Sequence, residues 1–492
     1  MKKTRLMALL ICLCLLTGCT TAPAPEADPG EPLPIAAPNA SAAPIGDTGL
    51  SYEAIATLCL PARDGQQLLT IYEPLTFSYS IHPAETVVRA LLAHGGNDRV
   101  SPVSSAALVV AGGDPVEVSC SIATVNLSAA ALGISREELH TVCRAITATL
   151  CQMDDIDHVN ILVSGVPVAV DHAGYLPLGT LTAQTGQELP VLWEQLLARR
   201  VPEGTLATAA PLTATAALYF PLTDGSGIAP EVRRITFSGQ HPQQLVMALL
   251  TALSAGSETL PSAADYPDLN ALMTAVPEIA ETADGHLRVT LSFTGDLRSW
   301  ITAAGADPAC TFAALVNTLT TFVPNLTEVC IYTGERAVTS VMCDAHGSQL
   351  FEGGVHTRVD YSGYLMSLTQ VYSPSESWLS AQSAALPYRS VHSPRALLLA
   401  MNCLPGPLSD ADVLGLSVSG DTLTVNLSAR YADVLRDCPE DQRLLAYAMV
   451  NTLCKGLDVR RVRFCFDSTQ IDNLGGELLW SGDFLYNPGL IR

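Results

Sequence analysis

Three histidines occur at corresponding places in the chain, each just before a proline that is suited to begin a helix. They are His82, His241 and His392. Histidine binds metals and transfers protons near neutral pH, so a histidine that recurs is the first candidate for chemistry. Because the three lie in separate segments, one metal ion could not bind them all without an oligomer, and we expect them to serve helix starts instead. The ten histidines form no HExxH, HxxxH or clustered Cys/His pattern, so we predict no metal site and no cofactor.

Four asparagines are the next candidates for a binding site. Asn126 and Asn426 each lie in the hexapeptide Thr-Val-Asn-Leu-Ser-Ala, which occurs twice, and Asn317 and Asn451 lie near the ends of predicted helices. Asparagine is a poor strand former, but at the end of a strand its side chain can bond to nearby backbone groups. We therefore predict structural roles for all four, with a binding role as the open alternative.

Acidic and serine motifs give no stronger candidate. The run Asp154-Asp155-Ile156-Asp157 could bind calcium, but it lacks the glycine and the distal glutamate of an EF-hand loop, so we expect a solvated turn between a helix and a strand. The segment from Gly415 to Gly420 has one residue too many for a nucleophile elbow and lies in a predicted hairpin. We predict no catalytic residues and no enzyme activity, although sequence alone does not exclude two carboxylates facing a cleft, as in a glycosidase.

The N-terminus carries the most specific short signal. Basic residues precede an apolar stretch that is too short to span a bilayer and that ends in Leu16-Thr17-Gly18-Cys19. This arrangement resembles a bacterial lipoprotein signal with its lipobox. It implies removal of residues 1–18 and attachment of a lipid to Cys19, which would anchor the protein outside the cytoplasm. The alternative is an ordinary cleaved signal peptide followed by a chance cysteine.

Composition narrows the class of protein. The chain has 492 residues, 48% of them hydrophobic, and its 26 Lys and Arg stand against 48 Asp and Glu, for a net charge of −22. This balance argues against nucleic acid as a partner, because phosphate binding needs a basic face. Eleven of the 14 cysteines lie beyond the signal region, mostly in apolar runs and without a CxxC pair, which favours buried thiols and leaves disulfides open.

One order of elements recurs three times along the chain. Each copy begins with a strand that ends in proline, followed by a second strand and a helix that starts at proline with one apolar face. A hairpin follows, whose second strand is the hexapeptide or, in the middle copy, its weaker relative Val289–Ser292. A second helix ending in Thr-Leu and a Val-rich strand close the copy. The pattern strand, strand, helix, strand, strand, helix, strand predicts an α+β fold with hairpins and not βαβ winding.

The repeats divide the chain into three domains of similar kind. A Pro-rich tether separates the repeats from the signal. A linker with a predicted helix at 190–200 separates repeat 1 from repeat 2. The predicted segments are a signal peptide at 1–18, a lipidated tether at 19–51, repeat 1 at 52–180, a linker at 181–212, repeat 2 at 213–365 and repeat 3 at 366–492.

These features together resemble the GerMN domain, which occurs in lipoproteins of spore formation and germination. The likeness rests on the strand ending in proline, the helix ending in small-Leu-Leu, the Val-Asn-Leu-Ser strand and the Thr-Leu helix end, and it covers residues 52–492 apart from the insert. It implies ring-building-motif-like modules that assemble outside the membrane, with no known catalytic residues.

The resemblance also sets the expected function and partners. We expect an envelope lipoprotein that acts as a non-catalytic scaffold or assembly module, in sporulation or germination. The alternative is an enzyme or binding protein of the cell wall. Expected partners are the membrane, through the lipid, and envelope or sporulation proteins, with peptidoglycan and a homo-oligomer left open.

Overall fold

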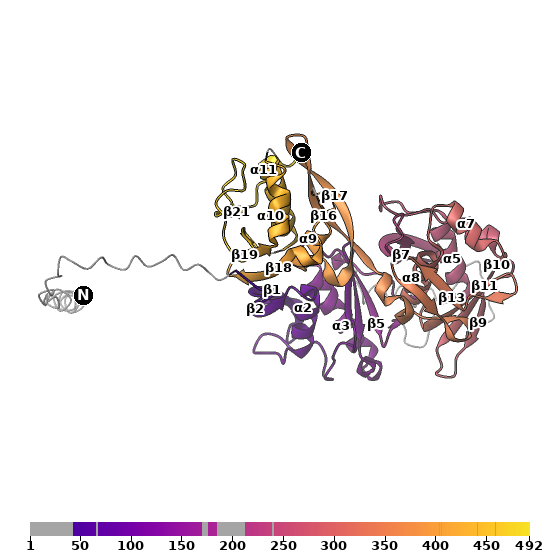
Figure 1. Ribbon diagram of the computed structural model, residues 1–492. Coiled ribbons are helices and arrows are strands. Elements are labelled where there is room, and N and C mark those ends of the chain that lie inside the picture. Colours follow the sequence, from indigo (N-terminus) through magenta and orange to yellow (C-terminus); the bar gives the residue numbers. More distant parts are fainter. Residues whose placement is uncertain are drawn as a thin grey trace, which may run out of the picture. The chain divides into compact units, whose positions relative to one another are not determined.

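A computed structural model describes residues 43–64, 67–169, 176–184, 212–238, 241–402, 404, 406–439, 441–457 and 459–492. The segment Ala43–Arg492 forms one unit of helices and small sheets, so the predicted α+β class is confirmed (Figure 1). The predicted signal peptide, Cys19 and the predicted helix at 190–200 lie outside the described residues. Among the described residues, no helix is long and apolar enough to cross a membrane.

Each repeat opens with a long antiparallel hairpin that forms a two-stranded sheet of its own. As predicted, the first strand of the hairpin ends at or near a proline, and Gly225 at φ 69° makes the turn of the second hairpin. The third hairpin is the long orange ribbon in Figure 1. The three pairs are β1 (Ser51–Pro61) with β2 (Leu68–Ser78), β7 (Leu212–Pro221) with β8 (Ile228–Phe237), and β16 (Met366–Ser375) with β17 (Trp378–Pro387).

The helix that follows each hairpin starts at the predicted proline. Its predicted apolar face is buried, for example at Val88, Leu249 and Leu397. Proline fits this place because its missing N–H would have no partner in the first turn. The three helices are α2 (Pro83–Ala93), α5 (Pro242–Ser254) and α9 (Pro394–Leu399), and the short α6 (Leu269–Leu272) follows α5.

A four-stranded path forms the second half of each repeat. The sheet orders are β3-β4-β5-β6, β12-β11-β10-β9 and β18-β19-β20-β21. In repeat 1 the elements are β3 (Val116–Ser119), β4 (Ile122–Leu127), α3 (Arg136–Leu150), β5 (His158–Val163) and β6 (Val166–Pro167). In repeat 2 they are β9 (Glu278–Glu281), β10 (Leu287–Phe293), α7 (Leu297–Ala303), α8 (Pro308–Phe322), β11 (Leu326–Thr333) and β12 (Arg336–Ala337). In repeat 3 they are β18 (Val413–Ser419), β19 (Thr422–Leu427), α10 (Ala429–Arg436), α11 (Gln442–Gly456), β20 (Arg461–Phe466) and β21 (Asp483–Leu485).

The prediction that the chain lacks βαβ winding is wrong in one respect. The strands on either side of the second helix run parallel in all three repeats, as β4 with β5, β10 with β11 and β19 with β20. A parallel neighbour needs a crossover connection, and a helix of 15 residues supplies it. Each repeat therefore contains one βαβ unit between an antiparallel edge strand and a short closing strand.

Two smaller predictions also need correction. The run Cys438-Pro439-Glu440-Asp441 predicts a helix with Pro439 and the acids in its first turn, but α11 begins at Gln442, so Pro439 lies before the helix. In repeat 1 the turn after β5 donates to the carbonyl of Leu127, and in repeat 2 the turn after β11 donates to the carbonyl of Phe293. Phe293 therefore corresponds to Leu127, and the residue before it, Ser292, corresponds to Asn126. The middle copy of the hexapeptide is therefore shifted by two residues from the position that its sequence suggests.

A threonine near the end of each second helix holds the opening hairpin. Its Oγ1 accepts the N–H of a residue in the first strand, at 2.9 Å, 2.9 Å and 3.0 Å in the three repeats. These helix-end threonines are almost completely buried. The pairs are Thr149 with Cys59, Thr318 with Tyr219 and Thr452 with Tyr372. The recurrent Thr-Leu thus joins helix and strand in each copy.

The buried apolar residues form two large clusters. One cluster includes residues of repeats 1 and 2 together, and the other belongs mainly to repeat 3. Tyr79 of repeat 1 lies in the cluster of repeat 3, and Tyr388 of repeat 3 lies in the shared cluster. Repeat 2 also carries a hairpin of β13 (Ser340–Cys343) and β14 (Gly347–Leu350), and β15 (Val355–His356), which pairs with β11.

Candidate functional site

The asparagines of the repeated strand fix the turn that follows the neighbouring parallel strand. Asn126 accepts the N–H of Gly165 on Oδ1 at 2.8 Å, and Asn426 accepts that of Ser468 at 3.0 Å. The amide of Asn426 also donates to the carbonyl of Pro44 at 2.9 Å. The structural interpretation of both residues is confirmed. The same bond from the asparagine to the turn occurs in both copies, which explains why the hexapeptide recurs.

The asparagines near the helix ends also bond to backbone. Asn451 donates to the carbonyl of Asn487 at 2.9 Å and accepts its N–H at 2.8 Å, which holds the C-terminal segment against α11. Asn317 donates to the carbonyl of Ala313 in its own helix at 2.8 Å. These bonds confirm the structural interpretation for this pair as well.

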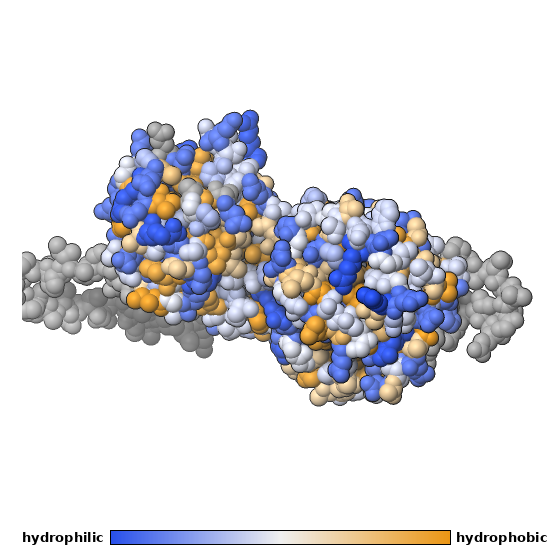
Figure 2. Space-filling view, turned by 45° about the vertical axis from the view of Figure 1, so that its right-hand side comes forward, coloured by the Kyte–Doolittle hydropathy of each residue, from blue (hydrophilic) through white to orange (hydrophobic). Residues whose placement is uncertain are grey.

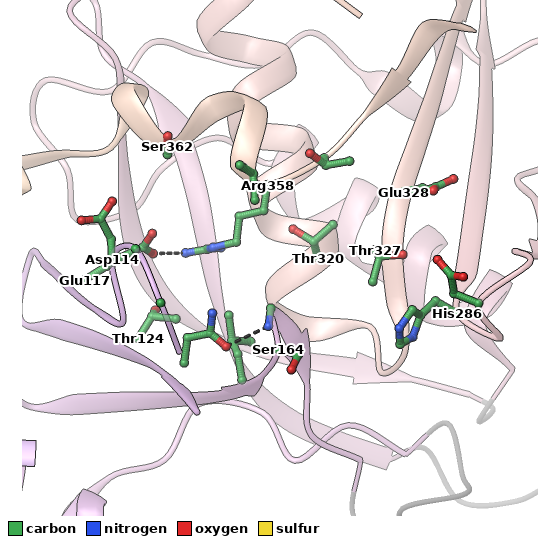
Figure 3. A pocket seen from close by; sticks show the side chains of 18 residues that line it. Asp114, Glu117, Thr124, Ser164, His286, Thr320, Thr327, Glu328, Arg358 and Ser362 are labelled. Atoms are coloured by element: carbon green, nitrogen blue, oxygen red, sulfur yellow. Dashed lines mark hydrogen bonds and ion pairs between the residues drawn. The ribbon is translucent and has the colours of Figure 1, made fainter. Parts of the chain in front are cut away.

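A cleft of about 500 Å³ lies between repeat 1 and repeat 2 (Figure 3). Residues at the ends of β4 and β5 form one wall, and residues of α8, β11 and the segment after β15 form the other. Four carboxylates and one guanidinium are among the lining groups, so the cleft is the first place to look for acid–base chemistry. The charged residues are Asp114, Glu117, Asp284, Glu328 and Arg358.

Arg358 is the centre of this cleft. Figure 3 shows its side chain extended toward Glu117, with which it forms an ion pair, and both side chains are nearly buried. The guanidinium also donates to Thr321 Oγ1 at 2.5 Å and lies 5.7 Å from the ring centre of Tyr219. Burial disfavours the charge on Arg358, but the attraction of Glu117 outweighs burial and raises the pKa of Arg358 above its ordinary value.

Two of the other three acids of the cleft also have arginine partners. Asp114 pairs with Arg389 and Glu328 with Arg288. A general acid in a glycosidase needs a carboxyl group whose pKa is raised, so that it holds a proton near neutral pH. A neighbouring guanidinium has the opposite effect, because it favours the ionised carboxylate. Of the three pairs, Glu117–Arg358 joins repeat 1 to repeat 2, so this ion pair is the charged contact between the two walls of the cleft.

The structure brings two of the three recurring histidines together. The rings of His82 and His392 lie 4.5 Å apart, and their Nε2 atoms are 3.1 Å and 3.8 Å from Oδ2 of Asp155. The three histidines do not all converge, as predicted, but two that lie in separate repeats do meet within one chain, which the sequence did not predict. The acidic run forms an exposed turn between α3 and β5, as predicted, and Asp155 keeps 47% of its side chain exposed while it contacts the histidines. His241 stands alone at the N-cap of α5, where its side chain makes no cap bond.

The tautomer of His82 decides what this histidine cluster can do. Its Nδ1 accepts the N–H of Ala84 at 3.1 Å, which confirms a helix-start role for this residue. In the neutral ring the proton then lies on Nε2, which donates to Asp155 and offers no lone pair to a metal. Burial opposes ionisation of Asp155, but the hydrogen bond from His82 outweighs burial and lowers the pKa of the carboxyl group. We interpret the cluster as a polar contact between repeats 1 and 3.

A further group of possible ligands has no sequence motif. Asp307, Cys310 and Cys343 converge in repeat 2, although α8 carries the first cysteine and β13 the second. Metal-ligand patterns are recognised by close spacing, and a pair brought together only by the fold has none. All cysteines among the described residues are free thiols.

Taken together, the fold defines a chain of tandem α+β modules, each with an opening hairpin and one βαβ unit. Residues 58–169 match the family model Germane, described as sporulation and spore germination. This segment of repeat 1 therefore matches a Germane domain, in agreement with the resemblance that the sequence suggested.

Solved structures with GerMN domains are also similar to this chain. The tandem GerMN domains of the sporulation protein GerM from Bacillus subtilis are 17% identical, with 57% of this chain and 91% of that chain covered and a TM-score of 0.24. The first GerMN domain of the same protein is 20% identical, with 27% of this chain and 98% of that chain covered and a TM-score of 0.23. A putative lipoprotein from Clostridium perfringens is 16% identical, with 28% and 93% covered and a TM-score of 0.19. No curated protein matches the sequence.

Proposed function

We propose that the protein is a lipid-anchored scaffold or assembly module of the cell envelope, outside the cytoplasm, with no catalysis of its own. The Germane domain links the chain to sporulation and spore germination, and we propose that it acts in one of these processes. The lipobox at Cys19 supports the anchor and the location.

The observation that carries the non-catalytic part is the charge pairing in the cleft between repeats 1 and 2. Three of its acids pair with arginines: Glu117–Arg358 joins repeats 1 and 2, Asp114–Arg389 joins repeats 1 and 3, and Glu328–Arg288 lies within repeat 2. A rigid unit built from three similar modules presents a large surface for protein contacts. Figure 2 shows hydrophobic and hydrophilic residues interspersed on the face in view.

Photocrosslinking in cells tests the scaffold role. A photoreactive amino acid replaces one exposed apolar residue in each repeat: Ile55 at 73%, Met342 at 66% or Leu479 at 67% exposure. We expect irradiation to produce specific adducts with envelope proteins from more than one repeat, and the same variants without irradiation are the control. Crosslinks only to peptidoglycan, or none at all three positions, would contradict the proposal.

A digestion assay tests the alternative, a cell-wall enzyme. Purified protein is incubated with peptidoglycan beside the variants Glu117→Gln and Glu328→Gln. We expect no release of fragments by any of the three proteins. Release that one carboxylate variant abolishes, while its unfolding curve stays unchanged, would replace the scaffold by an enzyme.

Labelling with a fatty-acid analogue tests the anchor. Cys19→Ala should abolish labelling and leave an unprocessed precursor. Cys14→Ala is the matched control, because this cysteine lies in the same signal region without the lipobox context, and it should leave labelling intact. Labelling that survives Cys19→Ala would refute lipid attachment at Cys19 and favour an ordinary exported protein.

A further inference from the structure

Asp307, Cys310 and Cys343 meet at the start of α8. One carboxylate oxygen of Asp307 caps the helix by accepting the N–H groups of Ala309 and Cys310 at 2.8 Å and 3.0 Å. Cys310 lies in the first turn, and Cys343 ends β13. A carboxylate oxygen and the two Sγ atoms all lie within 4.8 Å of one another. Tetrahedral zinc at about 2.3 Å from each sulfur would place such atoms about 3.8 Å apart, so small shifts suffice.

The two thiols donate to the same backbone carbonyl. Both cysteines are buried, and both direct their S–H groups to the carbonyl of Gly225, at 3.6 Å and 3.7 Å. Gly225 belongs to the turn between β7 and β8, so the site joins three separate elements of repeat 2. A thiol is a weak donor, and two thiols on one oxygen contribute little to holding these elements together.

A buried hydroxyl beside the cluster has no partner. The residue Tyr364 is 3% exposed, and its hydroxyl makes no hydrogen bond. Its ring packs against His346, with 4.0 Å between the ring centres, and Nε2 of His346 bonds to the carbonyl of Ser226 at 2.8 Å, which places Tyr364 beside the β7–β8 turn. Ser226, next to Gly225, also has a buried hydroxyl without a partner. Buried polar groups in folded proteins are nearly always paired, so two unpaired hydroxyls here indicate that an occupant is expected.

We propose that Asp307, Cys310 and Cys343 bind one thiophilic divalent cation of the zinc class. Two sulfur ligands select soft or borderline metals over calcium and magnesium, which prefer oxygen. The second carboxylate oxygen of Asp307 is the third ligand, and water takes the fourth position. The hydroxyl of Tyr364 then donates a hydrogen bond to a bound thiolate, so this buried group gains a partner.

The occupied site carries one net negative charge. Binding releases one proton from each of the two thiols to solvent, so that two thiolates and one carboxylate face a cation of charge +2. The positive end of the dipole of α8, a helix of 15 residues, stabilises the remaining negative charge. The metal would fix the start of α8 against β13 and so stabilise repeat 2. The cluster of His82, His392 and Asp155 is less suited to a metal, because Nε2 of His82 carries a proton and offers no lone pair.

Metal content and cobalt spectroscopy test the site in the full mature chain, purified under reducing conditions. We expect one zinc per chain, and after replacement by Co²⁺ a near-ultraviolet thiolate-to-cobalt charge-transfer band. Cys310→Ser and Cys343→Ser should each lose the band and weaken zinc binding at least about 100-fold. Cys330→Ser is the matched control, because Cys330 is a buried thiol of β11 in the same repeat, and it should keep both.

Measurements on the unaltered chain keep the test independent of how well the variants fold. Zinc should raise the melting temperature of the chelator-treated protein, and calcium should not. Reduced protein without bound zinc and without a cobalt band refutes the site. So does a disulfide between Cys310 and Cys343 that persists in the protein as isolated, if zinc fails to bind after reduction. Zinc retained equally by Cys310→Ser and Cys343→Ser marks adventitious binding elsewhere and also refutes it.

Discussion

Replacing Thr452 by valine removes one oxygen from the core of repeat 3 while keeping the shape of the side chain. Thr452 is completely buried, and its Oγ1 is the acceptor for the N–H of Tyr372, a residue 3% exposed in β16. Valine leaves this N–H without a partner and without access to water. A buried donor left unpaired costs about 1–3 kcal/mol, so we expect unfolding to become easier by about 2 kcal/mol.

Thr452→Ser is the matched control for this prediction. Serine keeps the acceptor and loses one methyl group, which costs about 1 kcal/mol. The hydrogen-bond argument therefore ranks valine below serine, although valine fills the site better. A pure packing argument gives the reverse order, so the two variants separate the explanations.

Fluorescence of Trp480 during urea unfolding is the assay. This ring is completely buried in repeat 3, where its indole N–H donates to Gln442 and its faces contact Phe464 and Phe466. The other three tryptophans are first replaced by phenylalanine, so that the fluorescence reports the unfolding of repeat 3 alone. This matters because a chain of several domains need not unfold in a single two-state step. A valine variant as stable as the serine variant, or more stable, would refute the role of the helix-end threonines.

Three further predictions concern the core, a buried ion pair and pH. Leu427→Ala, at a completely buried site of β19, should destabilise repeat 3 by about 2–5 kcal/mol in the same urea assay, and wild-type stability would place its side chain outside the core. Arg358→Met leaves Glu117 charged and nearly buried, so it should cost about 3–5 kcal/mol, whereas adding Glu117→Met should recover most of that loss in thermal unfolding. Burial lowers the pKa of His356 to about 4, from 6.5, so the folded state disfavours its proton. The stability that this group contributes is present above pH 6.5 and is lost as the pH falls toward 4. His356→Gln should therefore flatten the pH dependence of the urea midpoint between pH 6.5 and 4. An unchanged slope in this range would contradict the role of His356.

The repeated elements were predictable because they follow from local rules. Proline at a helix start, an apolar face at helical spacing and a glycine turn each need only neighbouring residues, and the starts of α2, α5 and α9 fall where these rules place them. The parallel pairing of β4 and β5 was missed because the order of elements is the same for both directions of the last strand. Strand direction depends on how a helix crosses the sheet, which no local pattern contains.

The polar clusters were missed for a related reason. His82 and His392 are far apart in sequence and meet only because repeat 3 packs on repeat 1. The spacing of Cys310 and Cys343 reflects an inserted hairpin in repeat 2, so no short motif marks them. Sequence periodicity indicates which face of a helix is buried, but not which distant segment covers it.

The three copies separate residues that serve the fold from residues that do something else. Thr149, Thr318 and Thr452 make the same bond in every copy, so the fold requires them. Cys310 lies eight residues before its helix-end threonine, and the same position holds Thr141 in repeat 1 and Leu444 in repeat 3. A position that the fold fills with three different side chains does not need sulfur for packing. A polar cluster present in one copy alone is therefore where a property specific to this chain should be sought, and in repeat 2 that cluster has the composition of a metal site.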